Sequence, residues 1–154
     1  MQTSASPSSP RAFGVVALLL IAVGFSVSLY LSYTKLADIP VACVEGTAFN
    51  CETVQAHPIG QIAGIPVSVL GLLMYAALAV LEFGRGRVAI LESNGEILFF
   101  GVVLLGWLFS MWLVYAQANI IHAWCIWCLT HEVAISGLLV LAIWRVRRHF
   151  LSLR

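Results

Sequence analysis

Four long runs of apolar residues, separated by shorter polar segments, set the pattern of this 154-residue chain. About 20 apolar residues in a helix cross the hydrocarbon core of a bilayer, and each run therefore predicts a transmembrane helix. The expected fold class is an all-α integral membrane protein, a bundle of four transmembrane helices with a long loop over residues 37–63 between the first and the second. The four runs cover residues 12–33, 64–81, 97–118 and 124–144.

The composition supports a membrane environment and argues against nucleic-acid binding. Hydrophobic residues make up 61% of the chain and charged residues 10%, and the mean hydropathy is +0.98. A soluble domain of this size could not bury so much apolar surface, so membrane lipid is an expected partner. A net charge of +1 offers no basic surface for nucleic acid. Residues 1–10, rich in Ser and Pro, predict a disordered tail, and residues 11–154 predict one membrane domain.

The basic residues predict how the helices are oriented in the membrane. Cytoplasmic segments of membrane proteins are enriched in Lys and Arg. One side of the predicted bundle receives seven of the eight basic residues, and the other side receives Lys35 alone. Both termini are therefore expected in the cytoplasm, with the long loop on the extracytoplasmic face. The seven are Arg11, Arg85, Arg87, Arg145, Arg147, Arg148 and Arg154.

Local signals organise the long loop and the start of the second span. Asn50 is a residue type favoured at helix N-caps, and it predicts a short helix from Cys51 to about His57. Because proline is tolerated in the first turn of a helix, we expect Gly64-Ile65-Pro66 to open the second span.

Four cysteines are the candidates for chemistry, and all of them fall on the predicted extracytoplasmic face. Cys43 and Cys51 lie in the long loop, whereas Cys125 and Cys128 form a CxxC motif where the fourth span begins. The positive end of a helix dipole favours the thiolate form of a nearby cysteine. Because the thiolate is the nucleophile in thiol–disulfide exchange, two such pairs on one membrane face indicate a redox-active relay. Cys43, in extended chain, is expected to meet an external substrate.

The residues alone leave three other interpretations open. Free cysteines are often small buried hydrophobes, which would make the chain a purely structural four-span protein. Two static disulfides in an oxidising compartment would also fit. The four thiols, with or without His57 and His122, could instead bind a metal such as zinc, as in a membrane metal-binding protein.

Three motifs, taken in order, resemble the vitamin K epoxide reductase family in its bacterial form. They are the spacing Cys43-x₇-Cys51, the run Gly64-Ile65-Pro66 at the start of the second span, and Cys125-Ile126-Trp127-Cys128-Leu129 at the start of the fourth. The resemblance extends from the first span to the fourth. It implies a four-helix membrane enzyme and, as in bacterial members, a place in the inner membrane.

The resemblance also implies a role for each cysteine. Cys125 and Cys128 would form the active site beside a quinone (ubiquinone, menaquinone or vitamin K), with Cys128 nearer the quinone and able to form a transient adduct. Cys125 would exchange with Cys51, and the Cys43/Cys51 pair would take electrons from a separate thioredoxin-fold protein of the periplasm or lumen. The implied function is a quinone-dependent thiol oxidoreductase that generates disulfides without a metal. An alternative is reduction of vitamin K epoxide or quinone by the same cysteines.

Two residues depart from the pattern that this resemblance implies. His57 stands where family members commonly carry Ser or Thr, and it can donate a hydrogen bond or relay a proton near neutral pH, with a solvated loop histidine as the alternative. Glu132 stands where animal members carry Tyr near the quinone, and a carboxyl inside a span invites a role in quinone binding or protonation, with a structural hydrogen bond or ion pair as the alternative. Trp124 and Asn119 are further candidates for the quinone pocket, although Trp is routine at membrane interfaces and Asn in turns.

Overall fold

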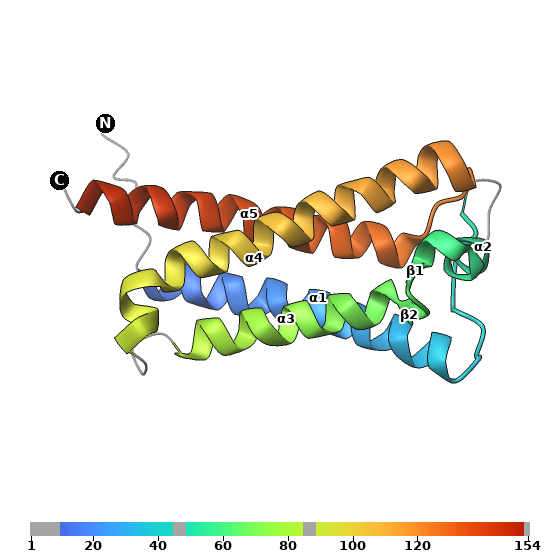
Figure 1. The fold of residues 1–154 in the computed structure, drawn as a ribbon, viewed down its shortest axis with the longest axis horizontal. Coiled ribbons are helices and arrows are strands. Elements are labelled where there is room, and N and C mark those ends of the chain that lie inside the picture. The colour runs from blue at the N-terminus through green and yellow to red at the C-terminus, as the bar shows by residue number, and fades with distance from the viewer. Residues whose placement is uncertain (1–9, 45–48, 85–88, 153–154) are drawn as a thin grey trace, which may run out of the picture.

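Four long helices lie side by side along most of the length of the molecule (Figure 1). The computed structural model describes residues 10–44, 49–84 and 89–152. Within these residues, four helices are long and apolar enough to cross a membrane, which confirms the predicted class of an all-α membrane protein. They are α1 (Pro10–Leu36), α3 (Val67–Gly84), α4 (Ala89–Ala116) and α5 (Ile126–Ser152). A helix satisfies all of its backbone polar groups internally, as a lipid environment requires.

Part of the sequence-based prediction concerns residues that the structure does not describe. The predicted tail lies outside the described residues except for Pro10, which begins α1. Three of the basic residues used for the orientation, Arg85, Arg87 and Arg154, also lie outside them.

The core of the bundle forms where α1 packs against α3 and α5, and α4 packs against α5. Tyr75, Phe99 and Leu138 are among its fully buried side chains. The ring of Tyr75 fits because Gly24 faces it, and a Cβ on Gly24 would lie only 2.0 Å from the ring. A small residue at this position therefore allows α1 and α3 to approach closely.

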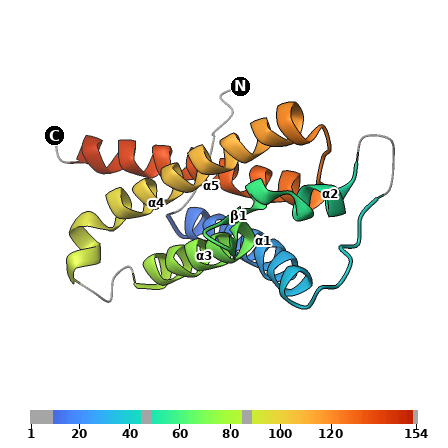
Figure 2. The same cartoon turned by 45° about the vertical axis from the view of Figure 1, so that its right-hand side comes forward.

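Short elements cover the end of the bundle at which α1 ends and α5 begins (Figure 1, Figure 2). We call residues 49–66 the cap. The cap contains α2 (Cys51–Ala56), a 3-10 turn η1 (Pro58–Gly60) and the strands β1 (Gln61–Ile62) and β2 (Ile65–Pro66). The Asn50 side chain accepts a hydrogen bond of 2.9 Å from Thr53 N–H, so the predicted N-cap of α2 is confirmed.

The predicted start of the second span is wrong by three residues. Ala63 and Gly64 adopt positive φ angles of 52° and 81° and connect β1 to β2, which pair antiparallel. Two consecutive residues with positive φ are typical of a tight hairpin turn. Since the residue before a proline avoids the helical region, Ile65 stays extended and α3 begins only at Val67.

The connection between α4 and α5 also differs from a plain loop. The last turn of α4 widens into a π-helical segment, η2 (Gln117–Ile121), and His122 follows with a φ of 55°. Trp124 then forms an isolated parallel bridge with Phe49 of the cap. Because of this extended stretch, α5 begins at Ile126 rather than at the predicted residue 124.

A buried ion pair joins three helices at the opposite end of the bundle. Arg145 Nη1 and Nη2 donate to the two carboxylate oxygens of Glu82 at 2.9 and 3.0 Å, and Nη2 also donates to Phe13 O at 3.1 Å. The side chains of Arg145 and Glu82 are only 8% and 7% exposed. Helices α1, α3 and α5 are thus fixed relative to one another far from the cap.

Removing one partner of this pair should destabilise the fold. We expect Arg145→Met to lower the free energy of unfolding by about 3–5 kcal/mol, because it leaves a buried carboxylate without its counter-charge. Arg147→Met is the matched control, since Arg147 is exposed on the same helix and its change should stay within about 0.5 kcal/mol. Equilibrium unfolding in mixed detergent micelles measures both, and equal values for the two variants would contradict the prediction.

Candidate active site

A disulfide in the cap marks the first half of the site. Cys43 and Cys51 are bonded, with their Cα atoms 5.9 Å apart. Cys51 is the first residue of α2 and is fully buried, whereas Cys43 is partly exposed. The Cys51 N–H donates to Cys43 Sγ at 3.3 Å. The disulfide therefore joins a partly exposed residue to a fully buried one.

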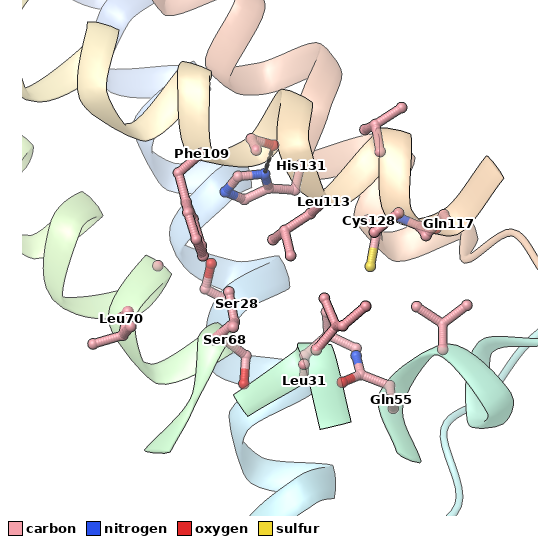
Figure 3. Close-up of a pocket in the computed structure, with 18 of the residues that line it drawn as sticks. Ser28, Leu31, Gln55, Ser68, Leu70, Phe109, Leu113, Gln117, Cys128 and His131 are labelled. Atoms are coloured by element: carbon pink, nitrogen blue, oxygen red, sulfur yellow. Dashed lines mark hydrogen bonds between the residues drawn. The ribbon is translucent and has the colours of Figure 1, made fainter. Parts of the chain in front are cut away.

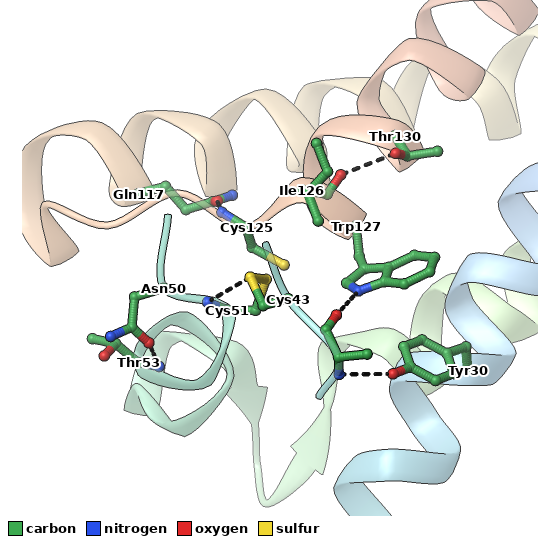
Figure 4. The surroundings of a disulfide bond; sticks show 11 residues. Tyr30, Cys43, Asn50, Cys51, Thr53, Gln117, Cys125, Ile126, Trp127 and Thr130 are labelled. Atoms are coloured by element: carbon green, nitrogen blue, oxygen red, sulfur yellow. Dashed lines mark hydrogen bonds between the residues drawn. A yellow bond between two sulfur atoms is a disulfide. The ribbon is translucent and has the colours of Figure 1, made fainter. Parts of the chain in front are cut away.

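The free thiol of Cys125 lies against this disulfide (Figure 4). Cys51, Val54, Ala123 and Cys125 form one buried cluster, and Cys43 packs on it. Cys125 C=O accepts a bond of 3.0 Å from Leu129 N–H, which makes Cys125 the N-cap residue of α5. The structure thus brings together Cys51 and Cys125, the two cysteines that would have to exchange.

Gln117 holds the backbone of Cys125 in this position. The Cys125 N–H donates to Gln117 Oε1 at 3.0 Å, and Gln117 is only 2% exposed. Gln117 belongs to the π-helical segment η2 that follows α4. This widened turn therefore places the Gln117 side-chain amide beside the start of α5. With this partner, the buried backbone N–H of Cys125 is not left without a hydrogen-bond acceptor.

The surroundings of Cys125 favour its thiolate. Its pKa is lowered from the ordinary 9.0 to about 7, chiefly because the Cys128 thiol donates a hydrogen bond to it, while burial opposes the shift. The backbone N–H groups of Cys128 and Trp127 also donate to the sulfur. These are the free donors of the first turn of α5, which an N-cap side chain normally accepts. At neutral pH a large fraction of Cys125 is therefore nucleophilic.

Cys128 faces a different environment, a cavity of about 310 Å³ inside the bundle (Figure 3). Helices α1, α3, α4 and α5 and the cap all contribute to its wall, which is mostly apolar. The polar groups that line it include Ser28, Ser68, Gln117 and His131. The Ser68 hydroxyl is buried without a hydrogen-bond partner. A mostly apolar cavity with a few polar groups, one of them unsatisfied, suits a flat apolar molecule that carries hydrogen-bond acceptors.

A network of hydrogen bonds lies behind one wall of this cavity. Ser110 Oγ lies 3.4 Å from His131 Nδ1, and both residues line the cavity. Ser110 Oγ also donates to one carboxylate oxygen of Glu132, and Ser136 Oγ donates to the other at 3.0 Å. Trp107 Nε1–H in turn donates to Ser136 Oγ at 3.0 Å. Glu132 is thus buried next to the cavity and connected to it through Ser110.

The other predicted site residues lie at the cap end, outside the residues that line the cavity. His57 caps η1, and its Nδ1 accepts a bond of 3.3 Å from Ile59 N–H. Trp124 O accepts a bond of 3.0 Å from Asn50 N–H. Asn119 is exposed, and its Nδ2 donates to Tyr115 O at 3.1 Å.

Sequence reasoning missed the face of α4 and η2 that lines the cavity. Gly106, Ser110, Leu113 and Gln117 all line the cavity, and their spacings of four, three and four residues place them on one helix face. The signal was present, because Ser110 and Gln117 are polar residues in an otherwise apolar run and lie seven apart. Polar residues in a span face the bundle interior, so this spacing could have indicated the cavity-lining face.

The metal-binding interpretation finds no ligand set in the part of the chain that the structure describes. There, no group of three or more His, Cys, Asp or Glu side chains is arranged to hold a metal ion. Two of the four thiols are joined in the Cys43–Cys51 disulfide.

One family of known proteins matches most of the chain. A sequence model described as the vitamin K epoxide reductase family matches residues 15–143. The matched stretch contains all four cysteines, the whole cap and the residues that line the cavity.

The hydrogen bond from Cys128 should control the ionisation of Cys125. With the loop disulfide closed, Cys125 is the one remaining thiol in both Cys128→Ala and Cys128→Ser. Loss of the donor in Cys128→Ala should raise the pKa of Cys125 from about 7 toward 9.0, so that the thiolate appears only at higher pH. Cys128→Ser keeps a hydroxyl donor, so the pKa of Cys125 should stay below that in Cys128→Ala. Ultraviolet thiolate absorbance against pH measures both midpoints, and coincident midpoints would refute the role of this bond.

Proposed function

We propose that this chain, which belongs to the vitamin K epoxide reductase family, is a quinone-dependent thiol–disulfide oxidoreductase. The family implies an oxidoreductase, and the four apolar helices place it in a membrane. In the proposed reaction a reduced thiol protein gives two electrons to the Cys43/Cys51 pair. The Cys125/Cys128 pair passes them to a quinone, and the net product is a disulfide in the thiol protein.

One observation carries this proposal: the two sulfurs of the CxxC motif face different partners. Cys125 lies in the same buried cluster as Cys51, whereas Cys128 lines the cavity. A structural cysteine pair would have no need of this division. A relay needs it, because one sulfur must exchange with the loop while the other serves the electron acceptor.

The internal exchange can be written with every bond accounted for. The Cys51 thiolate attacks Cys125 Sγ, breaking the Cys125–Cys128 disulfide and forming a Cys51–Cys125 bond. Cys43 then attacks Cys51, which closes the Cys43–Cys51 disulfide and releases Cys125 as thiolate. Two electrons have moved inward, and the products are the closed loop disulfide and the free thiols of Cys125 and Cys128 found here. The lowered pKa of Cys125 makes it a good leaving group in this step.

The cavity is the proposed quinone site. Its volume of about 310 Å³ lies at the lower end of the range for small-molecule pockets, roughly 300–1,000 Å³. A bound quinone supplies the capacity to take up two electrons and two protons. Ser68, whose hydroxyl lacks a partner, would orient the head group. Cys128 would present its sulfur to it, and Cys125 would close the disulfide afterwards.

The wall behind Ser110 supports a role for Glu132 in proton supply. Glu132 is connected to the cavity through the Ser110 hydroxyl, which also lies near His131 Nδ1. In the proposal the carboxyl is a relay: when it takes up a proton, its O–H donates to Ser110 Oγ, and the Ser110 hydroxyl donates its own proton into the cavity. A buried carboxyl inside a span is costly and is usually retained for function.

The remaining candidates are proposed to act on the cap or at its rim. His57 would position Ile59, which lines the cavity. Trp124 would hold Asn50, the residue before Cys51. Asn119 is proposed only as an exposed polar group at the cap end of the bundle.

The thiol partner is proposed to be a separate thioredoxin-fold protein of the periplasm or lumen. Cys43 supports this, since it is the more exposed residue of the loop disulfide. The cysteine-bearing end also carries Lys35, at the end of α1, whereas Arg145, Arg147 and Arg148 lie near the far end of α5. This distribution supports cytoplasmic termini and extracytoplasmic cysteines, and the resemblance to bacterial family members adds the inner membrane to the proposal.

Cys128→Ala should abolish quinone reduction by the purified protein. Because only Cys128 of the four cysteines lines the cavity, its loss should lower turnover by at least about 10³-fold, as for other residues that act directly on the substrate. The assay follows quinone absorbance, with menadione and a short-chain ubiquinone in separate runs and a reduced thioredoxin-fold protein as donor. Vitamin K epoxide in place of the quinone tests the alternative substrate.

The same preparation separates the redox function from metal binding. An oxidoreductase yields two disulfides per chain on oxidation and loses turnover when either cysteine pair is mutated. Stoichiometric bound metal together with no quinone reduction in the wild type would reject the proposal.

Glu132→Gln should slow quinone reduction while leaving exchange between the cysteine pairs intact. We expect a loss of about 10²-fold or more, the usual worth of a positioned proton donor. Ser110→Ala, on the cavity side of Glu132, should have a similar effect. Ser136→Ala is the matched control, because Ser136 bonds the other carboxylate oxygen and does not line the cavity. Stopped-flow quinone absorbance measures all three, and a Ser136→Ala loss as large as that of Ser110→Ala would rule out this proton path.

A further inference from the structure

Two aromatic side chains hold the backbone of Ala42, the residue directly before Cys43. Ala42 N–H donates to Tyr30 Oη at 2.9 Å, and Trp127 Nε1–H donates to Ala42 O at 2.7 Å (Figure 4). The rings of Tyr30 and Trp127 pack against each other with centroids 4.7 Å apart. Both polar groups of this one residue are therefore taken up by side chains from two different helices, α1 and α5.

We propose that Tyr30 and Trp127, here called the Ala42 clamp, are positioning residues that keep Cys43 in place for exchange with the CxxC pair. This inference rests on the proposed function. It assigns to Trp127, the residue before Cys128, a second task beside its place in the motif. It also gives a task to Tyr30, which the cysteine pattern does not point to.

The loop segment before Cys51 is held in a similar way to the segment before Cys43. Asn50, which precedes Cys51, donates its N–H to Trp124 O at 3.0 Å. Each loop cysteine is thus preceded by a residue that is hydrogen-bonded to a Trp next to Cys125 or Cys128. The two segments are held from both sides of Cys125, by Trp124 just before it and by Trp127 two residues after it.

The clamp matters most when the loop disulfide is open. The Cys43–Cys51 bond itself holds the two segments together in the oxidised state. The contacts at Ala42 and Asn50 involve no sulfur, so in the proposal they persist once that bond is broken. Cys43 must then attack Cys51 in line with the departing Cys125, and a displacement of about 1 Å in such a step costs up to about 10²-fold in rate.

An aromatic pair at a membrane interface is the simpler explanation, and it makes a different prediction. Interfacial Trp and Tyr need only an apolar ring and access to water. They do not need hydrogen bonds to one loop residue. Trp127→Phe and Tyr30→Phe keep an aromatic ring and remove only the donor or the acceptor, so they distinguish a clamp from an interfacial anchor.

The test uses the full-length protein with all four cysteines reduced, mixed rapidly with excess menadione or short-chain ubiquinone in separate runs. Four thiols can reduce two quinones per chain, so the wild type should show two phases. The first comes from the Cys125/Cys128 pair, and the second requires electrons from the Cys43/Cys51 pair. In Trp127→Phe and Tyr30→Phe we expect the second phase to slow by about 10- to 100-fold, with an unchanged first phase and an unchanged quinone KM.

Controls and contrary outcomes are defined by the same two phases. Tyr33→Phe, at an exposed position one turn further along α1, and Trp144→Phe, which can keep its stacking on Phe13 at the far end of α5, should leave both phases as in the wild type. An unchanged second phase in both clamp variants would overturn the inference, and so would equal slowing of both phases. Tyr30→Phe removes a single oxygen, so it stays informative if Trp127→Phe does not fold. Absence of both phases in the wild type would instead reject the proposed function.

Discussion

The residue at which helix α5 begins decides how the site is arranged. Since Cys125 is the N-cap residue and Cys128 lies within the first turn, the two sulfurs are three residues apart yet face different surroundings. The N-cap sulfur takes up the free N–H groups of the first turn and lies against the loop disulfide. The Cys128 side chain lines the cavity inside the bundle. A helix that began two residues earlier would place both on one continuous face.

That starting point is itself held by groups far away in the sequence. Gln117, from the last turn of α4, binds the Cys125 amide, and Trp124 is paired with the cap through Phe49 and Asn50. The cap also closes one side of the cavity with Val54. One short segment therefore carries Cys51, fixes the approach to α5 and covers the apolar space beside Cys128. The cap therefore contacts both halves of the site.

Hydropathy could predict the four helices, because lipid demands about 20 apolar residues in each. It could not predict where those helices end. Pro66 is compatible with a first helical turn, yet the hairpin at Ala63 and Gly64 keeps it in a strand. Asn50 was predictable as an N-cap because that signal is local. The hydrogen bond between Gln117 and Cys125 joins two segments between which the chain reverses direction. No periodicity in the sequence predicts such a contact.

Burial gives the proposed relay its order. Cys43 is partly exposed, Cys51 and Cys125 are fully buried, and Cys128 faces an apolar cavity. In the proposed relay, a macromolecular thiol would therefore react with Cys43, and a lipid-soluble acceptor in the cavity would react with Cys128. In the proposed relay, the exchange between Cys51 and Cys125 would take place among buried residues, which would protect the intermediate mixed disulfide from other thiols. Under the proposed function, electrons enter at Cys43 and leave at Cys128. The burial of Cys51 and Cys125 between them keeps the thiol protein and the quinone apart.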